Sequence, residues 1–185
     1  EVDRFSPLHD DCLPHDCAGL ILGGGYPELY AQTLSLNTAI MQSIQRHCAQ
    51  GMVIYAECGG LMYLSAGIIC GDQRHPLLGI LPSWVEMGDR LRRLGYVQAQ
   101  LQQDCPLGQA GEVLHGHEYH YSHLLKEPAG WEPLYLCRDV RGAEPRAEGW
   151  WKGDVTASYV HLALEALPQT LDSWVKHCTQ KENFA

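Results

Sequence analysis

Two short apolar runs, each followed within a few residues by glycines, constrain the fold of this chain most strongly. Residues 17–22 (CAGLIL) end in Gly23-Gly24-Gly25, and residues 52–55 (MVIY) are followed by Ala-Glu-Cys and then by Gly59-Gly60. A short apolar run that opens into glycine is typical of a parallel strand buried on both faces. These runs therefore predict two neighbouring strands of one sheet.

Helical spacing separates the two runs. Apolar residues recur at Ile40, Met41, Ile44 and Cys48, after Asn37 as a favourable N-cap, and Gly51 ends the pattern. A second helix is expected to begin near Gly60. Strand, helix, strand and helix in this order predict an α/β fold with right-handed crossovers.

Later segments favour antiparallel strands added to that core. Residues 96–101 (YVQAQL) alternate apolar and polar side chains, as do parts of 112–122 and 148–160. A last helix is expected after Pro168, burying Leu171, Trp174, Val175 and Cys178. We therefore expect a mostly parallel central sheet with helices on both faces and added antiparallel strands.

Length and composition favour one domain spanning residues 1–185. The chain has no Pro/Ser-rich linker, and its formal charge of -9 makes nucleic acid an unexpected partner. Its eight cysteines are scattered, which favours reduced thiols and a cytoplasmic location. The apolar stretch 52–70 is interrupted by Glu57 and the Gly-Gly pair, so we expect no membrane span.

Cys58 lies where the second strand is expected to turn sharply into a helix. Such a turn places a thiol at the carboxyl edge of the sheet, where open α/β folds bind ligands. Gly59 and Gly60 leave room for a close approach of substrate, and backbone N–H groups there can bind an oxyanion. The alternative is that Cys58 is a small buried apolar residue, as many cysteines are.

A cysteine nucleophile needs a base, and His161 is the candidate in the strand-like run Ala-Ser-Tyr-Val-His-Leu (157–162). A histidine in such a run can equally be a core residue that makes one hydrogen bond. Residues 115–123 (HGHEYHYSH) are a rival centre, because alternating His and Glu can bind a metal. However, His117 and His120 are expected on opposite faces of a strand, so we predict no metal site.

The Gly23-Gly24-Gly25 loop matches neither the dinucleotide-binding nor the phosphate-binding glycine pattern. We therefore expect no nucleotide site and no cofactor in this chain. Exposed backbone N–H groups in such a loop suit the second donor of an oxyanion hole.

Taken together, these segments resemble a known family. The blocks LILGGGYPELYA, IYAECGGLMYL, GHEYHYS and ASYVHL, with SPLHDDCLP and GILP, are similar to the glutamine amidotransferase domain of cobyrinate a,c-diamide synthases. The resemblance runs from about Phe5 to the final helix. It implies a flavodoxin-like class I amidotransferase fold that hydrolyses glutamine for cobalamin biosynthesis.

The resemblance also implies roles for individual residues. Cys58 would be the nucleophile and His161 its base, with Gly24, Gly25 and Gly59 forming the oxyanion and substrate-binding surface. Ammonia would pass to a separate N-terminal synthetase domain, which uses ATP and Mg²⁺ to amidate corrin carboxylates. That domain is absent here, and we expect the chain, which lacks an initiator Met, to be the amidotransferase half of a longer protein.

One departure from other class I amidotransferases concerns the orientation of the histidine. Many of them place a Glu two residues after it, whereas here Leu162 and Ala163 follow His161. Glu57, His117 and Glu118 are the candidates for supporting residues. Two alternative functions stay open: a non-catalytic binding module whose histidines hold a metal or partner, and a cysteine hydrolase of another substrate.

Overall fold

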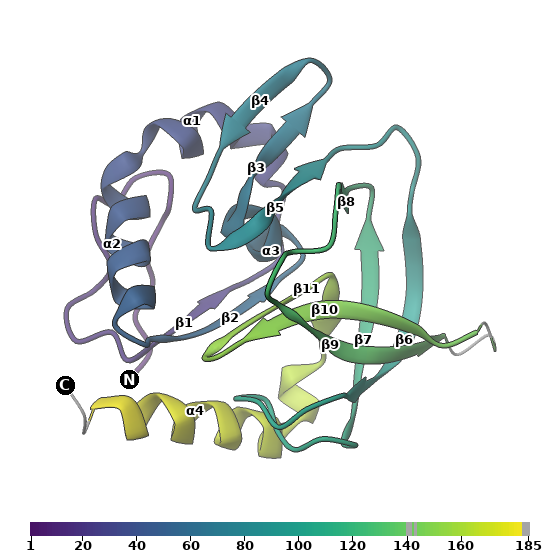
Figure 1. The fold of residues 1–185 in the computed structure, drawn as a ribbon. Helices are drawn as coiled ribbons and strands as arrows, with labels where there is room; N and C mark the ends of the chain where they lie inside the picture. The colour runs from purple at the N-terminus through teal and green to yellow at the C-terminus, as the bar shows by residue number, and fades with distance from the viewer. Residues whose placement is uncertain (140–141, 143, 183–185) are drawn as a thin grey trace.

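Three parallel strands form the part of the fold that carries the candidate nucleophile. The computed structural model describes residues 1–139, 142 and 144–182. In it β2 (Val53–Glu57) lies between β1 (Gly19–Leu22) and β11 (Val155–Ser158), parallel to both (Figure 1). Both glycine-ended runs are therefore adjacent strands, as the sequence predicts.

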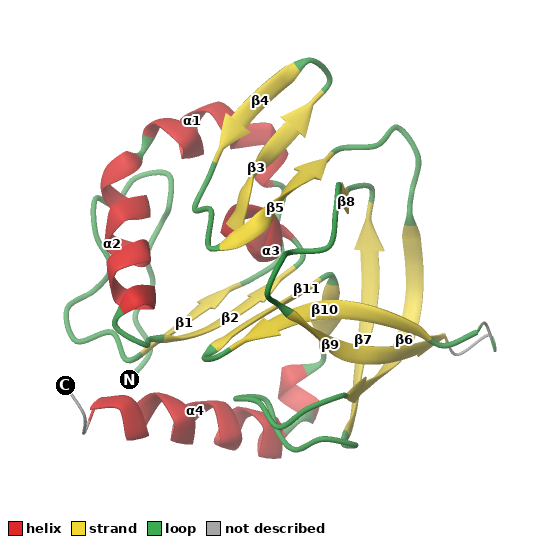
Figure 2. Cartoon of the chain, viewed as in Figure 1, coloured by secondary structure: helices red, strands yellow, loops and turns green. Residues whose placement is uncertain are grey.

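Helices cover both faces of these strands, which confirms that prediction. On one face lie α1 (Ala31–Leu36), α2 (Thr38–Ala49) and α3 (Gly59–Leu64), and on the other lies α4 (Pro168–Glu182) (Figure 2). A Cβ on Gly19 of β1 would lie 2.8 Å from the Trp174 ring of α4, so that helix packs closely on the sheet.

Strand β2 divides the apolar core because successive side chains point to opposite faces. Ile54 and Ala56 pack in the cluster that contains Ile40 and Ile44 of α2. Tyr55, in contrast, packs in a second cluster formed mainly by the antiparallel strands.

Antiparallel strands make up more of the sheet than the sequence predicts. In the part of the chain that the structure describes, eight strands pair in the order β1-β2-β11-β10-β9-β6-β7-β12, and only the pairs β1–β2 and β2–β11 are parallel. The expectation of a mostly parallel sheet thus holds only for the core around β2. The added strands are β6 (Arg93–Leu101), β7 (Val113–His120), β9 (Glu132–Asp139), β10 (Arg146–Lys152) and β12 (Val160–Leu162).

A bend at Tyr159 explains how this sheet curls. Tyr159 alone separates β11 from β12, yet four other strands lie between those two in the pairing order. The strip must therefore curve back on itself so that its last strand returns to β11 (Figure 1). This curvature brings His161 of β12 next to the end of β2.

A second sheet follows α3 directly. Ser65 ends the helix after six residues, and the chain continues as β3 (Ser65–Cys70), which pairs with β4 (Gln73–Pro76) and β5 (Leu81–Glu86). The short β8 (His123–Leu124) pairs with β5. Single 3₁₀ turns at Pro27–Tyr30 and Leu164–Ala166 complete the described elements.

Two details of the helices differ from expectation. Asn37 precedes α2, but its side-chain amide donates to the Pro7 and Asp10 carbonyls instead of capping the helix. Val175 of α4 is 51% exposed, whereas Cys178 is buried as predicted, because α4 turns only a narrow stripe toward the sheet.

Two further features concern the cysteines and the character of the helices. No disulfide joins any of the eight cysteines, all of which lie in the described part of the chain. None of the described helices combines the length and the apolar character needed to cross a membrane.

Candidate active site

Cys58 occupies a strained turn between β2 and α3. Its backbone has φ 49° and ψ −103°, a left-handed conformation that residues other than glycine rarely adopt. The surrounding structure holds it there: the Cys58 N–H donates to the Ser158 carbonyl at 2.7 Å, and the Cys58 carbonyl accepts from Met62 N–H at 3.0 Å. This sharp strand-to-helix turn presents the side chain at the edge of the sheet, as in a nucleophile elbow.

The glycine loop packs against the first turn of α3, where Gly59 and Gly60 have no room for side chains. A Cβ on Gly59 would lie 2.7 Å from the Gly25 nitrogen, and a Cβ on Gly60 would collide with the Leu22 carbonyl. The absence of side chains therefore lets the backbones of the loop and of the elbow meet. Two of the predicted oxyanion donors, Gly25 and Gly59, are brought side by side.

His161 interacts with both Cys58 and Glu57. Its Nδ1 lies 3.7 Å from Glu57 Oε1, and the His161 side chain is only 21% exposed. The hydrogen bond with Cys58, followed by the contact with Glu57, raises the pKa of His161 to about 10, although burial acts to lower it. The ring therefore carries a proton near neutral pH.

Glu57 is the carboxylate that faces the His161 ring. Its second oxygen accepts a hydrogen bond from the Tyr55 hydroxyl at 2.7 Å. Burial raises the pKa of the Glu57 carboxyl, but the contacts with His161 and Tyr55 outweigh burial, so that the pKa is lowered overall. Glu57 thus stays ionised beside the imidazolium and supplies a carboxylate to His161, which the residues after His161 do not.

Gly24 and His117 confine the imidazole of His161 further. The ring of His117 stacks on that of His161, with centroids 4.8 Å apart and planes 10° from parallel. A Cβ on Gly24 would collide with His161 Cε1 and would lie 3.0 Å from Nδ1. Both residues were predicted near the site, and the structure brings both to this ring.

The thiol of Cys58 is only narrowly open to solvent. Cys58 is 7% exposed, and its Sγ lies 3.8 Å from the Tyr119 carbonyl of β7. A cavity of about 480 Å³ lies beside the glycine loop, lined by Gly24, Gly25, Gly59 and apolar residues of the N-terminal segment, but not by Cys58. The cavity therefore borders the loop and does not contain the reacting atoms.

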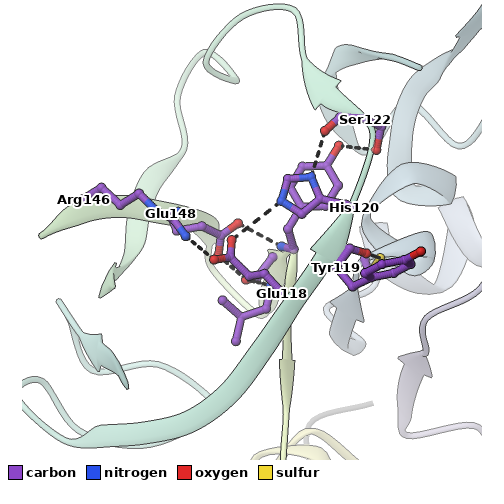
Figure 3. Close-up of polar contacts among 10 residues, drawn as sticks. Glu118, Tyr119, His120, Ser122, Arg146 and Glu148 are labelled. Atoms are coloured by element: carbon purple, nitrogen blue, oxygen red, sulfur yellow. Dashed lines mark hydrogen bonds and ion pairs between the residues drawn. The ribbon is translucent and has the colours of Figure 1, made fainter. Parts of the chain in front are cut away.

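Glu118 does not join this cluster, which corrects its predicted role. It lies on the opposite face of β7 from His117, where its carboxylate binds Arg146 and lies 3.7 Å from His120 Nε2 (Figure 3). The reason is the two-residue period of the strand, which sends neighbours 117 and 118 to different faces. Glu57 therefore provides the carboxylate next to His161.

The histidines of residues 115–123 also spread over different surroundings. His117 stacks on His161, His120 stacks on Tyr159 with ring centroids 4.0 Å apart, and His123 lies 3.6 Å from Glu86. Within the described ranges, no group of three or more His, Cys, Asp or Glu side chains is arranged to hold a metal ion.

Sequence reasoning missed two residues of the site. Tyr55 holds Glu57, and a sequence signal existed, because residues two apart on a strand share a face. The Tyr119 carbonyl beside the thiol left no such signal, since its position depends on how β7 meets the elbow.

This arrangement supports nucleophilic catalysis by Cys58. The His161 imidazole contacts both the Cys58 side chain and the Glu57 carboxylate, and paired glycine amides lie next to the sulfur-bearing turn. Such a set can form and hydrolyse an acyl thioester.

Several curated proteins similar to this chain are cobyrinate a,c-diamide synthases. A cobyrinate a,c-diamide synthase from Syntrophotalea carbinolica is 45% identical over 95% of this chain and 39% of its own length. Those from Salmonella typhimurium and Methanothermobacter thermautotrophicus are 42% and 41% identical over 94% and 91% of this chain. The chain thus spans about two fifths of the length of the curated relatives it matches.

Solved structures confirm the fold at lower sequence identity. The structure of PurLQS from Thermotoga maritima matches with a TM-score of 0.65 and 18% identity, covering 91% of this chain and 82% of that one. A crystal structure of a glutamine amidotransferase matches with a TM-score of 0.61 and 21% identity, over 88% of this chain and 79% of that one.

A family match covers most of the chain and confirms the resemblance seen in the sequence blocks. Residues 1–168 match the family described as the CobB/CobQ-like glutamine amidotransferase domain. This chain belongs to the CobB/CobQ-like glutamine amidotransferase domain family.

Proposed function

We propose that this chain is the glutaminase domain of a cobyrinate a,c-diamide synthase, and that it releases ammonia from glutamine through a thioester on Cys58. The observation that carries the proposal is the position of His161 between the Cys58 thiol and the Glu57 carboxylate. Three similar curated proteins named cobyrinate a,c-diamide synthase support the assignment to that enzyme.

Acylation begins with the thiolate of Cys58, which attacks the side-chain amide carbon of glutamine. The negative charge moves to the amide oxygen, where the N–H groups of Gly25 and Gly59 stabilise it. As the tetrahedral intermediate collapses, the C–N bond breaks and the His161 imidazolium donates its proton to the departing nitrogen. Ammonia leaves, and a γ-glutamyl thioester and a neutral imidazole remain.

Deacylation uses the same residues in reverse roles. His161, now neutral, takes a proton from water while the water oxygen attacks the thioester carbon. The C–S bond then breaks, glutamate is released, and the thiolate–imidazolium pair is restored. Glutamine and water have become glutamate and ammonia, and Glu57 keeps its negative charge throughout, stabilising the imidazolium.

The ammonia released here would serve a partner that lies outside this chain. That partner would be an ATP- and Mg²⁺-dependent synthetase domain that activates corrin ring carboxylates. The length of the curated relatives, of which this chain covers about two fifths, leaves room for such a domain.

Trapping the thioester tests the proposal. The chain is incubated with glutamine, alone and with the ATP-dependent part of a curated relative, then quenched in acid and examined by mass spectrometry. We expect a γ-glutamyl adduct on Cys58 that is absent in Cys58→Ala. Cys70→Ala is the matched control, because Cys70 lies in β3, outside the cluster, and its loss leaves the adduct in place.

Other outcomes would favour the alternative functions. Adducts from simple esters or peptides, with none from glutamine, would indicate a cysteine hydrolase of another substrate. Stoichiometric zinc in the purified chain, lost in His120→Ala, would indicate a metal-binding module.

A further inference from the structure

The bend at Tyr159 connects the two reacting residues. On one side of it, the Ser158 carbonyl accepts the hydrogen bond from the Cys58 N–H. On the other side, Val160 leads directly into His161. The distance between nucleophile and imidazole therefore depends on the shape of residues 158–160.

One half-buried carboxylate, that of Glu148 on β10, holds this bend. Its Oε1 accepts from the Tyr159 N–H at 2.9 Å, and its Oε2 accepts from the Ser158 hydroxyl (Figure 3). The Ser158 oxygen in turn accepts from the Val160 N–H at 2.9 Å. Glu148 thus binds the bend directly twice and, through Ser158, a third time.

A glycine lets the strand that carries Glu148 come this close. Gly149 has φ 71°, and a Cβ on it would lie 3.0 Å from the Ser158 Cβ. A side chain at position 149 would therefore push β10 away from the bend and weaken both carboxylate contacts.

Even partial burial of the Glu148 carboxylate has an energetic cost, which calls for a physical reason. Burial, followed by the nearby Glu118 carboxylate, raises the pKa of Glu148, while the bonds from Ser158 and Tyr159 and the charge of Arg146 act against the rise. An apolar residue at 148 would avoid that cost, but it would leave the buried Tyr159 N–H and Ser158 hydroxyl without this acceptor.

We propose that Glu148 is a positioning residue, which fixes the Ser158–Val160 bend and thereby sets the placement of His161 relative to Cys58. This inference rests on the proposed function, because it assigns Glu148 a role in the same thiolate–imidazole pair. Neither the family blocks nor the sequence pattern singled this residue out.

The test measures the pairing of Cys58 with His161 without needing glutamine turnover. Iodoacetamide alkylates thiolates, and site-resolved mass spectrometry measures the alkylation rate of Cys58. The rate at pH 7 divided by the rate at about pH 9.5 is the Cys58 rate ratio. Exposed Cys12 serves as the internal reference in each sample. The variants are Glu148→Gln and Ser158→Ala, with thermal unfolding recorded for each.

Ser83→Ala is the matched control for a lost buried hydroxyl. The Ser83 hydroxyl donates to the Lys126 carbonyl at 2.7 Å in the second sheet, away from the bend. Ser83→Ala is expected to lower the stability of the fold and to leave the Cys58 rate ratio unchanged. This control therefore distinguishes a positioning role of Glu148 from a general effect of lower stability.

We expect Glu148→Gln to lower the Cys58 rate ratio about tenfold, because a neutral amide cannot accept both hydrogen bonds and the imidazole moves away from the sulfur. Ser158→Ala is expected to lower it in the same direction. A folded Glu148→Gln chain that keeps the wild-type ratio would overturn the inference; if that variant does not fold, an unchanged ratio in Ser158→Ala does so. A His161→Ala chain with the wild-type ratio would contradict the proposed function instead.

Discussion

The carboxylate of Glu57 lies 3.7 Å from the imidazole of His161, although 103 residues separate them, and Glu57 immediately precedes the candidate nucleophile. A single strand end thus supplies both the thiol and the group that orients the base. This relationship explains how the site can operate without a carboxylate two residues after the histidine, where Ala163 stands.

Removing the charge of Glu57 should slow the reaction. We expect Glu57→Gln to reduce the rate of thioester formation on the order of 100-fold, because the imidazolium loses its counter-ion and its fixed orientation. Rapid acid quenching and mass spectrometry measure that rate. Glu86→Gln is the control, since it alters the Glu86–His123 pair, where Oε2 lies 3.6 Å from Nε2 outside the site; equal losses in both variants would refute the role of Glu57.

The titration of His161 should depend on both of its neighbours. Because contact with Cys58 is the largest cause of its raised pKa, we expect Cys58→Ala to lower the pKa of His161 from about 10, and Glu57→Gln to lower it as well. NMR of the imidazole resonances as a function of pH measures this shift. An unchanged His161 titration in Cys58→Ala would show that the ring does not bind the thiol.

The same shift predicts how stability depends on pH. A group whose pKa is higher in the folded chain stabilises the fold fully below its unfolded value, and this contribution is lost as the pH rises through the folded value. The part of the stability due to His161 is therefore present below about pH 6.5 and disappears toward about pH 10. The free energies of unfolding of wild type and His161→Ala, measured with denaturant, should therefore converge as the pH rises through that range.

A methyl group on Gly24 should disable the site while one on Gly23 should not. The Cβ of Gly24→Ala would collide with the His161 ring, whereas a Cβ on Gly23 would meet no atom within 4 Å. We expect Gly24→Ala to lose most of its Cys58 thioester formation and Gly23→Ala to retain it. Equal activity of the two variants would contradict the placement of the glycine loop against His161.

Stacking by His117 should matter through its ring and not through its charge. We expect His117→Ala to slow thioester formation about tenfold, because the His161 ring gains freedom, and His117→Phe to restore most of the rate. Loss of activity in both variants would point instead to a proton-transfer or hydrogen-bonding role for His117.

Short sequence patterns predict the parts of the fold that depend on residues close together in the chain. The glycine-ended runs before Gly23 and Gly59 predict two of the three parallel strands, and the strand-to-helix turn predicts the place of Cys58. The third parallel strand, β11, lies in the segment 148–160, where the expectation of antiparallel strands was wrong for its pairing with β2. The sequence does not show where the strands on either side of Tyr159 pair, because residues 155–162 look like one continuous strand. In the structure a bend at Tyr159 divides them, so that β11 pairs with β2 and β12 pairs with β7.

The surroundings of the site were harder to predict, for a physical reason. Glu57 and Glu118 are both acidic residues beside candidate site residues, and only the face of the strand decides which one meets His161. That choice depends on how distant strands are placed, as does the contact between Glu148 and the Tyr159 backbone, which no local spacing indicates.

Covalent labelling by a diazo ketone analogue of glutamine tests the central claim most directly. The reagent requires both recognition of the glutamine skeleton and a reactive thiolate, so mass spectrometry reports the two together. We predict one adduct, on Cys58, absent in Cys58→Ala, slowed in His161→Ala and prevented by excess glutamine. Labelling at another cysteine, or none even with the ATP-dependent part of a relative present, would contradict the account.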